Sequence, residues 1–236
     1  MSAQVVMPER LLKADMVTAS DANNPQSPSN AARAAALAEI LVARLCHDLA
    51  GLVGSLAGAL ELAAEDPEAL AVAQSSAIAL QARLRLLRTA FGPSETALSR
   101  ADLHALFSMI ALPRRVALHL AFPNDEVAMP GTFAQLLLVL GMLGVESLAG
   151  EGHLVLEAAG PGEFVLSISG PRAAWPSGLI TYLTDPDSAL ASAPVQGPRG
   201  VLAPLAGLLA GLAGISVQAL LGAHDEKPLP LLISER

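Results

Sequence analysis

Residues 44–49 (Arg-Leu-Cys-His-Asp-Leu) place a histidine inside a long apolar segment. Apolar residues recur around it at steps of three and four, which is the period of one helix face in a bundle. His47 lies two positions before Leu49, a member of that stripe, and is therefore rotated about 200° from it. We expect the imidazole to face solvent or a groove, where a free ring nitrogen can attack an electrophilic phosphorus. The stripe consists of Leu41, Leu45, Leu49, Leu52, Leu56, Ala59 and Ala63.

Asp48 directly follows the histidine and carries the next reactive group. Its carboxylate is expected either to orient the imidazole or to accept its proton, and the residue types leave both roles open. A hydrolase triad is not expected, because adjacent helical residues point in different directions and the sequence contains no nucleophile elbow around a serine.

Arginines of a following helix are expected opposite His47, if that helix runs back along the first. Guanidinium groups stabilise the negative charge that spreads over phosphoryl oxygens during transfer. We expect Arg85 and Arg88, together with Arg44 one turn before the histidine, to supply this charge. The alternative is an ordinary solvated basic face, to which Arg83 also belongs.

The motif at the histidine resembles a known family. His47-Asp48-Leu49 followed by Gly58-x-x-Glu61-Leu62 resembles the phosphoacceptor box of sensor histidine kinases, and Arg-Leu-Cys-His-Asp-Leu is similar to ChpT-type histidine phosphotransferases of bacterial phosphorelays. The resemblance implies that His47 carries a phosphoryl group between aspartates of receiver domains, in a hybrid histidine kinase and in response regulators. It also implies that Mg²⁺ is held by the receiver and that this chain needs no cofactor.

Small residues follow the histidine along the same helix. Their size would let a helix of a receiver domain approach closely beneath His47, so we expect them to form the docking surface. The alternative is simple composition, because the chain contains 19 glycines. The residues are Gly51, Gly54, Ser55 and Gly58.

Composition excludes several classes of function. Of the 236 residues, 53% are hydrophobic and only 3% aromatic, so a sizeable core of Leu, Ala and Val is expected. The net charge of −8 argues against a nucleic-acid-binding surface. Cys46 is the one cysteine of the sequence, which excludes an intrachain disulfide and fits a reducing cytoplasm. No metal site is expected, because the remaining histidines show no ligand spacing.

Two long helices are expected at the N-terminal side of the chain. After a polar, disordered tail over residues 1–29, helices are predicted over 31–64 and 67–91, with Asp66 capping the second. Together they form an antiparallel hairpin, the dimerisation and phosphotransfer unit of residues 30–92. Closing its apolar seam with a second copy predicts a homodimer with a four-helix bundle. A monomeric hairpin packed on the C-terminal domain is the alternative. The expected seam of the second helix is Leu70, Ala73, Ala77, Leu80, Leu84, Leu87 and Phe91.

An α+β domain is predicted over residues 98–236, with a sheet covered by helices on one face. It resembles the ATP-binding domain of histidine kinases in element order, as an α/β sandwich. Its expected helices span 98–110, 133–148, 177–184 and 201–213, and its expected strands span 116–122, 153–158, 163–169, 215–221 and 229–234.

This domain lacks the residues with which such kinases bind nucleotide. No Asn stands near Gly144, where the kinases carry the Asn that binds Mg²⁺, and Glu146 is expected to be a helix-end charge. After the strand ending at Ser169, Gly170-Pro171-Arg172 replaces Asp-x-Gly-x-Gly. The resemblance therefore implies a degenerate ATPase-like domain that does not bind ATP.

Two uncharged stretches, 127–145 and 201–223, are long enough to span a bilayer. Both are rich in Gly, Ala and small polar residues and have no flanking aromatic belt or Lys/Arg asymmetry, so we expect no membrane span. The expected location is the cytoplasm. An autophosphorylating histidine kinase and a non-catalytic dimeric scaffold with an inert His47 remain as alternative functions.

Overall fold

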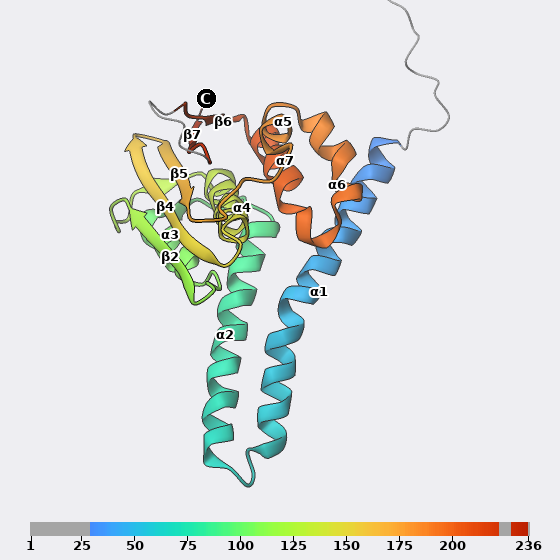
Figure 1. Cartoon of the computed structure of the whole chain (residues 1–236), viewed down its shortest axis with the longest axis vertical. Coiled ribbons are helices and arrows are strands. Elements are labelled where there is room, and N and C mark those ends of the chain that lie inside the picture. The colour runs from blue at the N-terminus through green and yellow to red at the C-terminus, as the bar shows by residue number, and fades with distance from the viewer. Residues whose placement is uncertain (1–28, 222–227, 236) are drawn as a thin grey trace, which may run out of the picture.

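The computed structural model describes residues 29–221 and 228–235. The expected disordered tail over 1–29 therefore lies outside the described residues except for Ser29. Two helices project as a hairpin from a body of helices and strands (Figure 1). This arrangement confirms the predicted α+β class with an N-terminal helical hairpin.

The hairpin consists of α1 (Asn30–Leu62) and α2 (Pro67–Phe91). Ser29 caps α1, because its side chain accepts a hydrogen bond of 3.2 Å from the backbone N–H of Ala32. Asp66 caps α2 through a 2.8 Å bond from the N–H of Glu68. Proline follows at the first helical position, which needs no N–H donor. Both helix starts lie within one residue of those predicted.

The inward face of α1 is the predicted stripe, whose members are all buried or half-buried. The prediction for α2 was partly wrong. Leu70 and Leu84 are 46% and 41% exposed, whereas Ala73 and Leu87 of the expected seam are buried. The buried face is small and includes polar groups, so an apolar pattern does not reveal it. The buried residues of α2 are Ala69, Ala73, Ser76, Leu86, Leu87 and Ala90.

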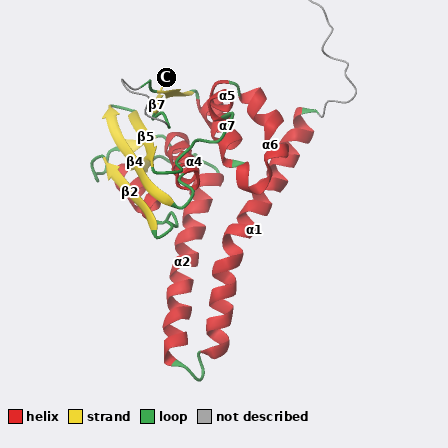
Figure 2. Cartoon of the chain, viewed as in Figure 1, coloured by secondary structure: helices red, strands yellow, loops and turns green. Residues whose placement is uncertain are grey.

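The body contains a five-stranded sheet in the order β2-β4-β5-β7-β6. Figure 2 labels four of these strands, β2, β4, β5 and β7. β2 and β4 are parallel, and the other neighbouring pairs are antiparallel. A separate short pair joins β1 to β3. The bounds are β1 Leu98–Ser99, β2 Arg115–Ala121, β3 Ala128–Met129, β4 Glu151–Gly160, β5 Glu163–Ser169, β6 Ile215–Ala219 and β7 Leu231–Glu235.

Helix α4 lies at the centre of the core, and almost all of its side chains are buried. It packs against the sheet on one side and against α2 and α7 on others. The predicted helices at 98–110, 133–148, 177–184 and 201–213 are all present. Their bounds are α3 Arg100–Ser108, α4 Gly131–Ser147, α5 Leu179–Thr184 and α7 Leu202–Ala213.

Helix α6 (Pro186–Gly200) was not predicted, and it lies alongside α1 (Figure 1). Asp185 caps its start by accepting from the N–H groups of Asp187 and Ser188 at 3.1 and 3.2 Å. Near its end the helix kinks at Gly197, whose φ of 66° and ψ of −178° favour glycine. The helix contains two internal prolines, which normally disfavour a helix, so the sequence pattern does not predict one here.

One helix of the described residues, α1, is long and apolar enough to cross a bilayer on length and composition alone. The two uncharged stretches noted in the sequence, 127–145 and 201–223, do not form such a helix within the described residues. Residues 131–147 form the buried α4, and α7 is only 12 residues long.

Two glycines give a matched test of this packing. A Cβ at Gly207 of α7 would collide with the backbone carbonyl of Tyr182 in α5, whereas a Cβ at Gly58 of α1 meets nothing within 4 Å. Gly207→Ala should lower the free energy of unfolding by about 2 kcal/mol. Gly58→Ala should raise it by roughly 0.5–1 kcal/mol, because alanine has less backbone entropy to lose in a helix. Urea denaturation of both variants checks the pair, and equal effects would contradict the α5–α7 packing.

Candidate functional site

The imidazole of His47 projects from α1 and is 68% exposed, as its rotation from the apolar stripe predicts. Its Nδ1 lies 3.5 Å from Oδ1 of Asp48, at the outer limit of a hydrogen bond. A proton on Nδ1 that faces this carboxylate leaves the lone pair of Nε2 available. No described residue bonds to Nε2. The geometry thus supports a nucleophilic Nε2 and an orienting role for Asp48.

Asp48 is itself held in place by two arginines. Its Oδ2 accepts from Nε of Arg44 at 3.2 Å and from Nη2 of Arg83 at 2.7 Å. Burial raises the pKa of the Asp48 carboxyl, but the charges and hydrogen bonds of Arg44 and Arg83 outweigh burial and lower it overall. The carboxylate next to His47 therefore stays ionised at neutral pH.

Arg44 is buried and uses each of its nitrogens on a protein acceptor. Besides Asp48, Nη1 donates to the carbonyl of Pro198 at 3.1 Å, and Nη2 donates to Oε1 of Glu146. Burial lowers the pKa of this guanidinium, but Glu146 and Asp48 outweigh it and raise the pKa overall. Arg44 thus joins α1 to α4 and α6. Because its donors are already engaged, it is poorly placed to bind a phosphoryl group as well.

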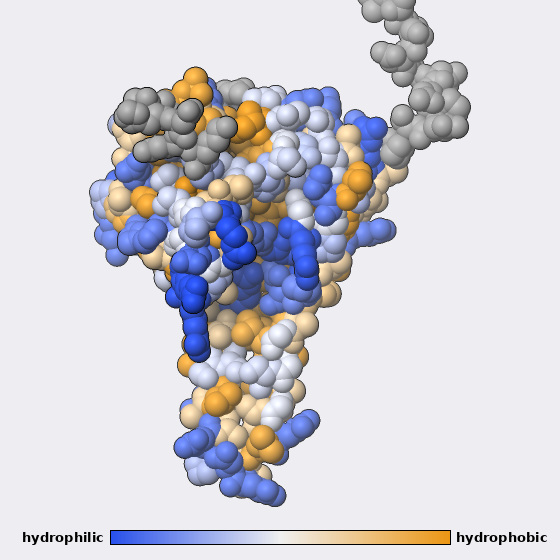
Figure 3. Space-filling view, in the orientation of Figure 1, coloured by the Kyte–Doolittle hydropathy of each residue, from blue (hydrophilic) through white to orange (hydrophobic). Residues whose placement is uncertain are grey.

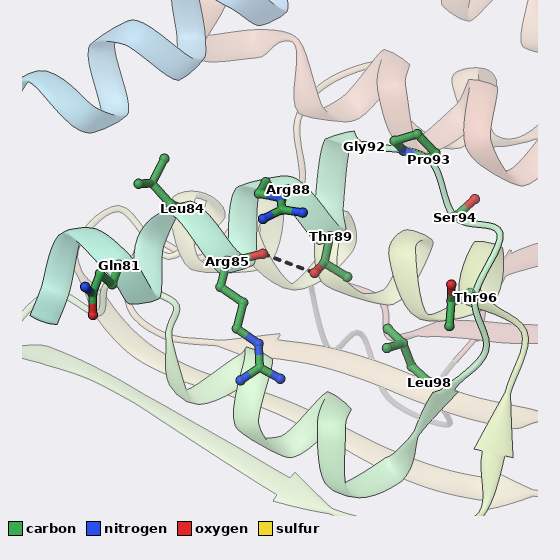
Figure 4. A pocket seen from close by; sticks show the side chains of 11 residues that line it. Gln81, Leu84, Arg85, Arg88, Thr89, Gly92, Pro93, Ser94, Thr96 and Leu98 are labelled. Carbon is green, nitrogen blue, oxygen red and sulfur yellow. Dashed lines mark hydrogen bonds between the residues drawn. The ribbon is translucent and has the colours of Figure 1, made fainter.

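The arginines of α2 occupy two different places. Arg83, assigned to a basic face from the sequence, reaches Asp48 from the helix face that also carries Ser76 and Leu87. Arg85 and Arg88, the predicted pair, line a separate cavity of about 760 Å³ between α2 and the segment that follows it (Figure 4). There Arg85 lies 3.8 Å from Asp102 of α3. The structure therefore does not bring this pair into the cavity that contains His47.

His47 and Asp48 line a cavity of about 880 Å³ where α1 meets α4 and α6. The C-terminal part of the chain supplies half of its lining, which the sequence did not predict. Glu146 comes from α4, and the other three residues come from the kinked end of α6. In the sequence, the only signal for these residues is that they are polar or proline, and this signal is too weak to identify a site. They are Glu146, Gln196, Pro198 and Arg199.

The four predicted docking residues lie on exposed parts of α1, beyond His47. A Cβ at Gly51, Gly54 or Gly58 would meet nothing within 4 Å, so this surface is open. The side chain of Ser55 instead points toward α2, where its Oγ lies 3.3 Å from Oγ of the buried Ser76.

Residues 29–221 and 228–235 hold no group of three or more His, Cys, Asp or Glu side chains placed to bind a metal ion. His119 and His153, distant in sequence, are neighbours on β2 and β4, with Nε2 and Nδ1 3.4 Å apart. His104 is a structural residue, since its Nε2 lies 3.0 Å from the carbonyl oxygen of Phe122.

Comparisons with solved structures place this architecture among known folds. The chain is similar to a bacterial phosphotransferase, with 23% identity, a TM-score of 0.62, and coverage of 85% of this chain and 96% of that chain. It also matches the kinase domain of a blue-light activated histidine kinase from Erythrobacter litoralis EL346, with 13% identity, a TM-score of 0.42, and coverage of 79% and 95%. That second similarity is too low to support an argument. No family model and no curated protein matches the sequence. The chain therefore shares the fold of the bacterial phosphotransferase.

The pairing of Asp48 with two arginines predicts a defined pH dependence. Asp48→Asn should lower the free energy of unfolding by about 2 kcal/mol at pH 7, because it removes the carboxylate that pairs with Arg83 and one of the two that pair with the buried Arg44. Because the pKa of Asp48 is lowered in the folded protein, its carboxylate stabilises the fold fully above the ordinary pKa of 3.8. This stabilisation is lost as the pH falls below that value. The gap between wild type and variant should therefore shrink below pH 3.8 in urea titrations.

Glu151→Gln is the control, because Glu151 forms an exposed pair with Arg115 at 3.6 Å. Removing that pair should change stability by less than about 0.5 kcal/mol. A gap for Asp48→Asn that stays constant down to pH 3 would show that the carboxylate charge does not stabilise the fold.

Proposed function

We propose that this protein is a histidine phosphotransferase of a bacterial two-component phosphorelay, with His47 as the phosphoryl acceptor. The observation that carries the proposal is an exposed imidazole whose Nδ1 faces a carboxylate fixed by Arg44 and Arg83. The fold shared with a bacterial phosphotransferase supports the same assignment. The acceptor motif around His47 adds a third line of support, independent of the fold.

The chemistry requires a donor with a good leaving group, and an aspartyl phosphate provides one. The lone pair of Nε2 forms the N–P bond while the P–O bond to the donor aspartate breaks, and the electron pair leaves with the aspartate carboxylate. The proton stays on Nδ1, so the ring becomes a phosphorylated imidazolium. Asp48 stabilises this positive charge from 3.5 Å away. Reversal on a second receiver restores neutral His47.

Receiver domains of a hybrid histidine kinase and of response regulators are the partners that this chemistry needs. They would dock on the open face formed by Gly51, Gly54 and Gly58, with Ser55 at its edge. Mg²⁺ would be held by the acidic site of the receiver.

An autophosphorylating kinase is the alternative, and the region around α4 argues against it. Glu146 is engaged by Arg44 and is not free to hold a cation. The neighbouring cavity of about 300 Å³, between α4 and the segment after β5, has no Asn or Asp in its lining. Its charged residues are Glu146, Arg172 and Arg199. We therefore propose that the C-terminal part is a degenerate ATPase-like domain that does not bind ATP.

A homodimer is part of the proposal, because the hairpin exposes many apolar side chains. The space-filling view shows apolar surface along the projecting part of the hairpin (Figure 3). A second copy would bury this surface in a four-helix bundle, as a lone hairpin cannot. The exposed apolar residues are Val42, Val53, Leu60, Leu62, Leu70, Val72, Ile78 and Leu84.

An apolar dimer surface would also account for the high hydropathy of α1, so that hydropathy does not require the helix to cross a bilayer. Arg44 and Asp48 lie in the middle of α1 and bond to α2, α4 and α6, so the helix packs on the rest of the protein. We propose a cytoplasmic protein that binds neither membrane nor nucleic acid.

The central test follows the phosphoryl group. The purified protein is incubated with a ³²P-phosphorylated receiver domain from a hybrid kinase, alongside His47→Ala and alongside a sample that contains ATP alone. Wild type should acquire acid-labile label from the receiver and none from ATP. His47→Ala should lose at least about 99% of that label, because no other group replaces the nucleophile.

Label from ATP alone would make the protein a kinase. Equal label on His47→Ala would move the acceptor elsewhere. A folded protein that takes no label from any of a panel of receivers would leave the non-catalytic scaffold.

The dimer has a separate test. Ile78 on α2 is 67% exposed and Leu212 on α7 is 85% exposed, which makes them a matched pair. Ile78→Lys should raise the dimer dissociation constant about 100-fold, because a symmetric interface loses the apolar side chain twice. Leu212→Lys should leave it unchanged. Light scattering across a dilution series measures both, and a wild type that is monomeric at every concentration would rule out the dimer.

A further inference from the structure

The cavity beside His47 is lined by two carboxylates and two arginines, and a third arginine, Arg83, reaches one of these carboxylates from α2. Asp48 and Glu146 are matched by Arg44 and Arg83 through the contacts described above. Arg199 remains, and within residues 29–221 and 228–235 it forms no ion pair and no side-chain hydrogen bond. An exposed guanidinium that lines the same cavity as the nucleophile is thus available to a ligand.

The backbone at Arg199 is positioned by the two residues that precede it. The carbonyl of Pro198 accepts from Nη1 of Arg44 at 3.1 Å, which ties the end of α6 to the helix that carries His47. The positive φ of Gly197 makes the kink that turns this segment toward α1. Arg199 therefore follows directly after an anchored residue and does not belong to a free loop.

We propose that Arg199 binds the phosphoryl oxygens while the group is attached to His47, so that the C-terminal part of the chain completes the phosphotransfer site. This inference rests on the proposed function and assigns a residue to it. The sequence predicted that Arg44, Arg85 and Arg88 would stabilise the phosphoryl charge. Arg44 is instead the anchor, and the other two line a different cavity.

The chemistry of the group favours an arginine at this point. Phosphotransfer leaves two negative charges on the three free oxygens of the phosphoryl group. A guanidinium presents paired N–H donors that match two of these oxygens, and such charge-assisted bonds are stronger than neutral ones. Arg199 also borders the neighbouring cavity, which contains Arg172, so its side chain lies at the junction of the two.

The test loads His47 by two routes, so that it does not depend on a cognate receiver. Wild type, Arg199→Gln and Arg199→Lys are phosphorylated either by a labelled receiver or chemically by phosphoramidate. Transfer from the receiver should slow at least about tenfold in Arg199→Gln. Arg199→Lys should recover part of the rate, because lysine keeps the charge and loses the paired donors.

The ³¹P resonance of the chemically loaded protein provides a readout that docking alone would not move. In wild type the nearby cation should lower the pKa of the phosphoryl group relative to Arg199→Gln, and the pH titration of the resonance measures this shift. Arg114→Gln is the control for the loss of one positive charge, because Arg114 is exposed and lies before β2, outside the cavity.

The outcomes separate the two proposals. Slowed transfer with a shifted ³¹P titration supports phosphoryl binding by Arg199. An unshifted titration overturns it, whatever the rate, and slowed transfer would then assign Arg199 to receiver docking. Wild-type behaviour of Arg199→Gln in both measurements overturns the inference and leaves His47 as the acceptor. Failure of the wild type to accept label from any receiver contradicts the proposed function itself.

Discussion

The buried guanidinium of Arg44 is the constraint on which the arrangement of the site depends. A buried positive charge is tolerated only where carboxylates and carbonyls surround it, because desolvation is otherwise too costly. Asp48 from the same helix, Glu146 from α4 and the Pro198 carbonyl from α6 meet this requirement together. Three elements far apart in sequence are thereby held at fixed positions around one side chain.

This arrangement couples the hairpin to the body of the protein. Asp48 is oriented by Arg44 on one side and by Arg83 on the other, so the carboxylate that faces His47 has little freedom. Packing of α6 along α1 covers the other side of the same cavity. A phosphoryl group on His47 would consequently lie between the two parts of the chain and not on an isolated helix.

The helix α4 connects the core of the body to the hairpin. Its interior positions are filled by glycine and apolar residues that pack against Phe107, Leu154 and the sheet. Its one exposed acid, Glu146, is bonded to the hairpin. In our proposal the domain supports the acceptor site with a salt bridge and an arginine, in place of a nucleotide.

The sequence alone determined the elements with strong local patterns. The capped starts of α1 and α2, the apolar stripe of α1, the exposure of His47 and most of the strands follow from spacing, capping residues and alternation, which are local properties. The tertiary structure decided the rest. The inner face of α2 has small and polar residues, so Arg83 could not be distinguished from Arg85 and Arg88, and the prolines of α6 concealed a helix. Arg199 reaches the cavity of His47 only because Gly197 turns the chain and Arg44 anchors Pro198, and such long-range contacts leave no periodic pattern in the sequence.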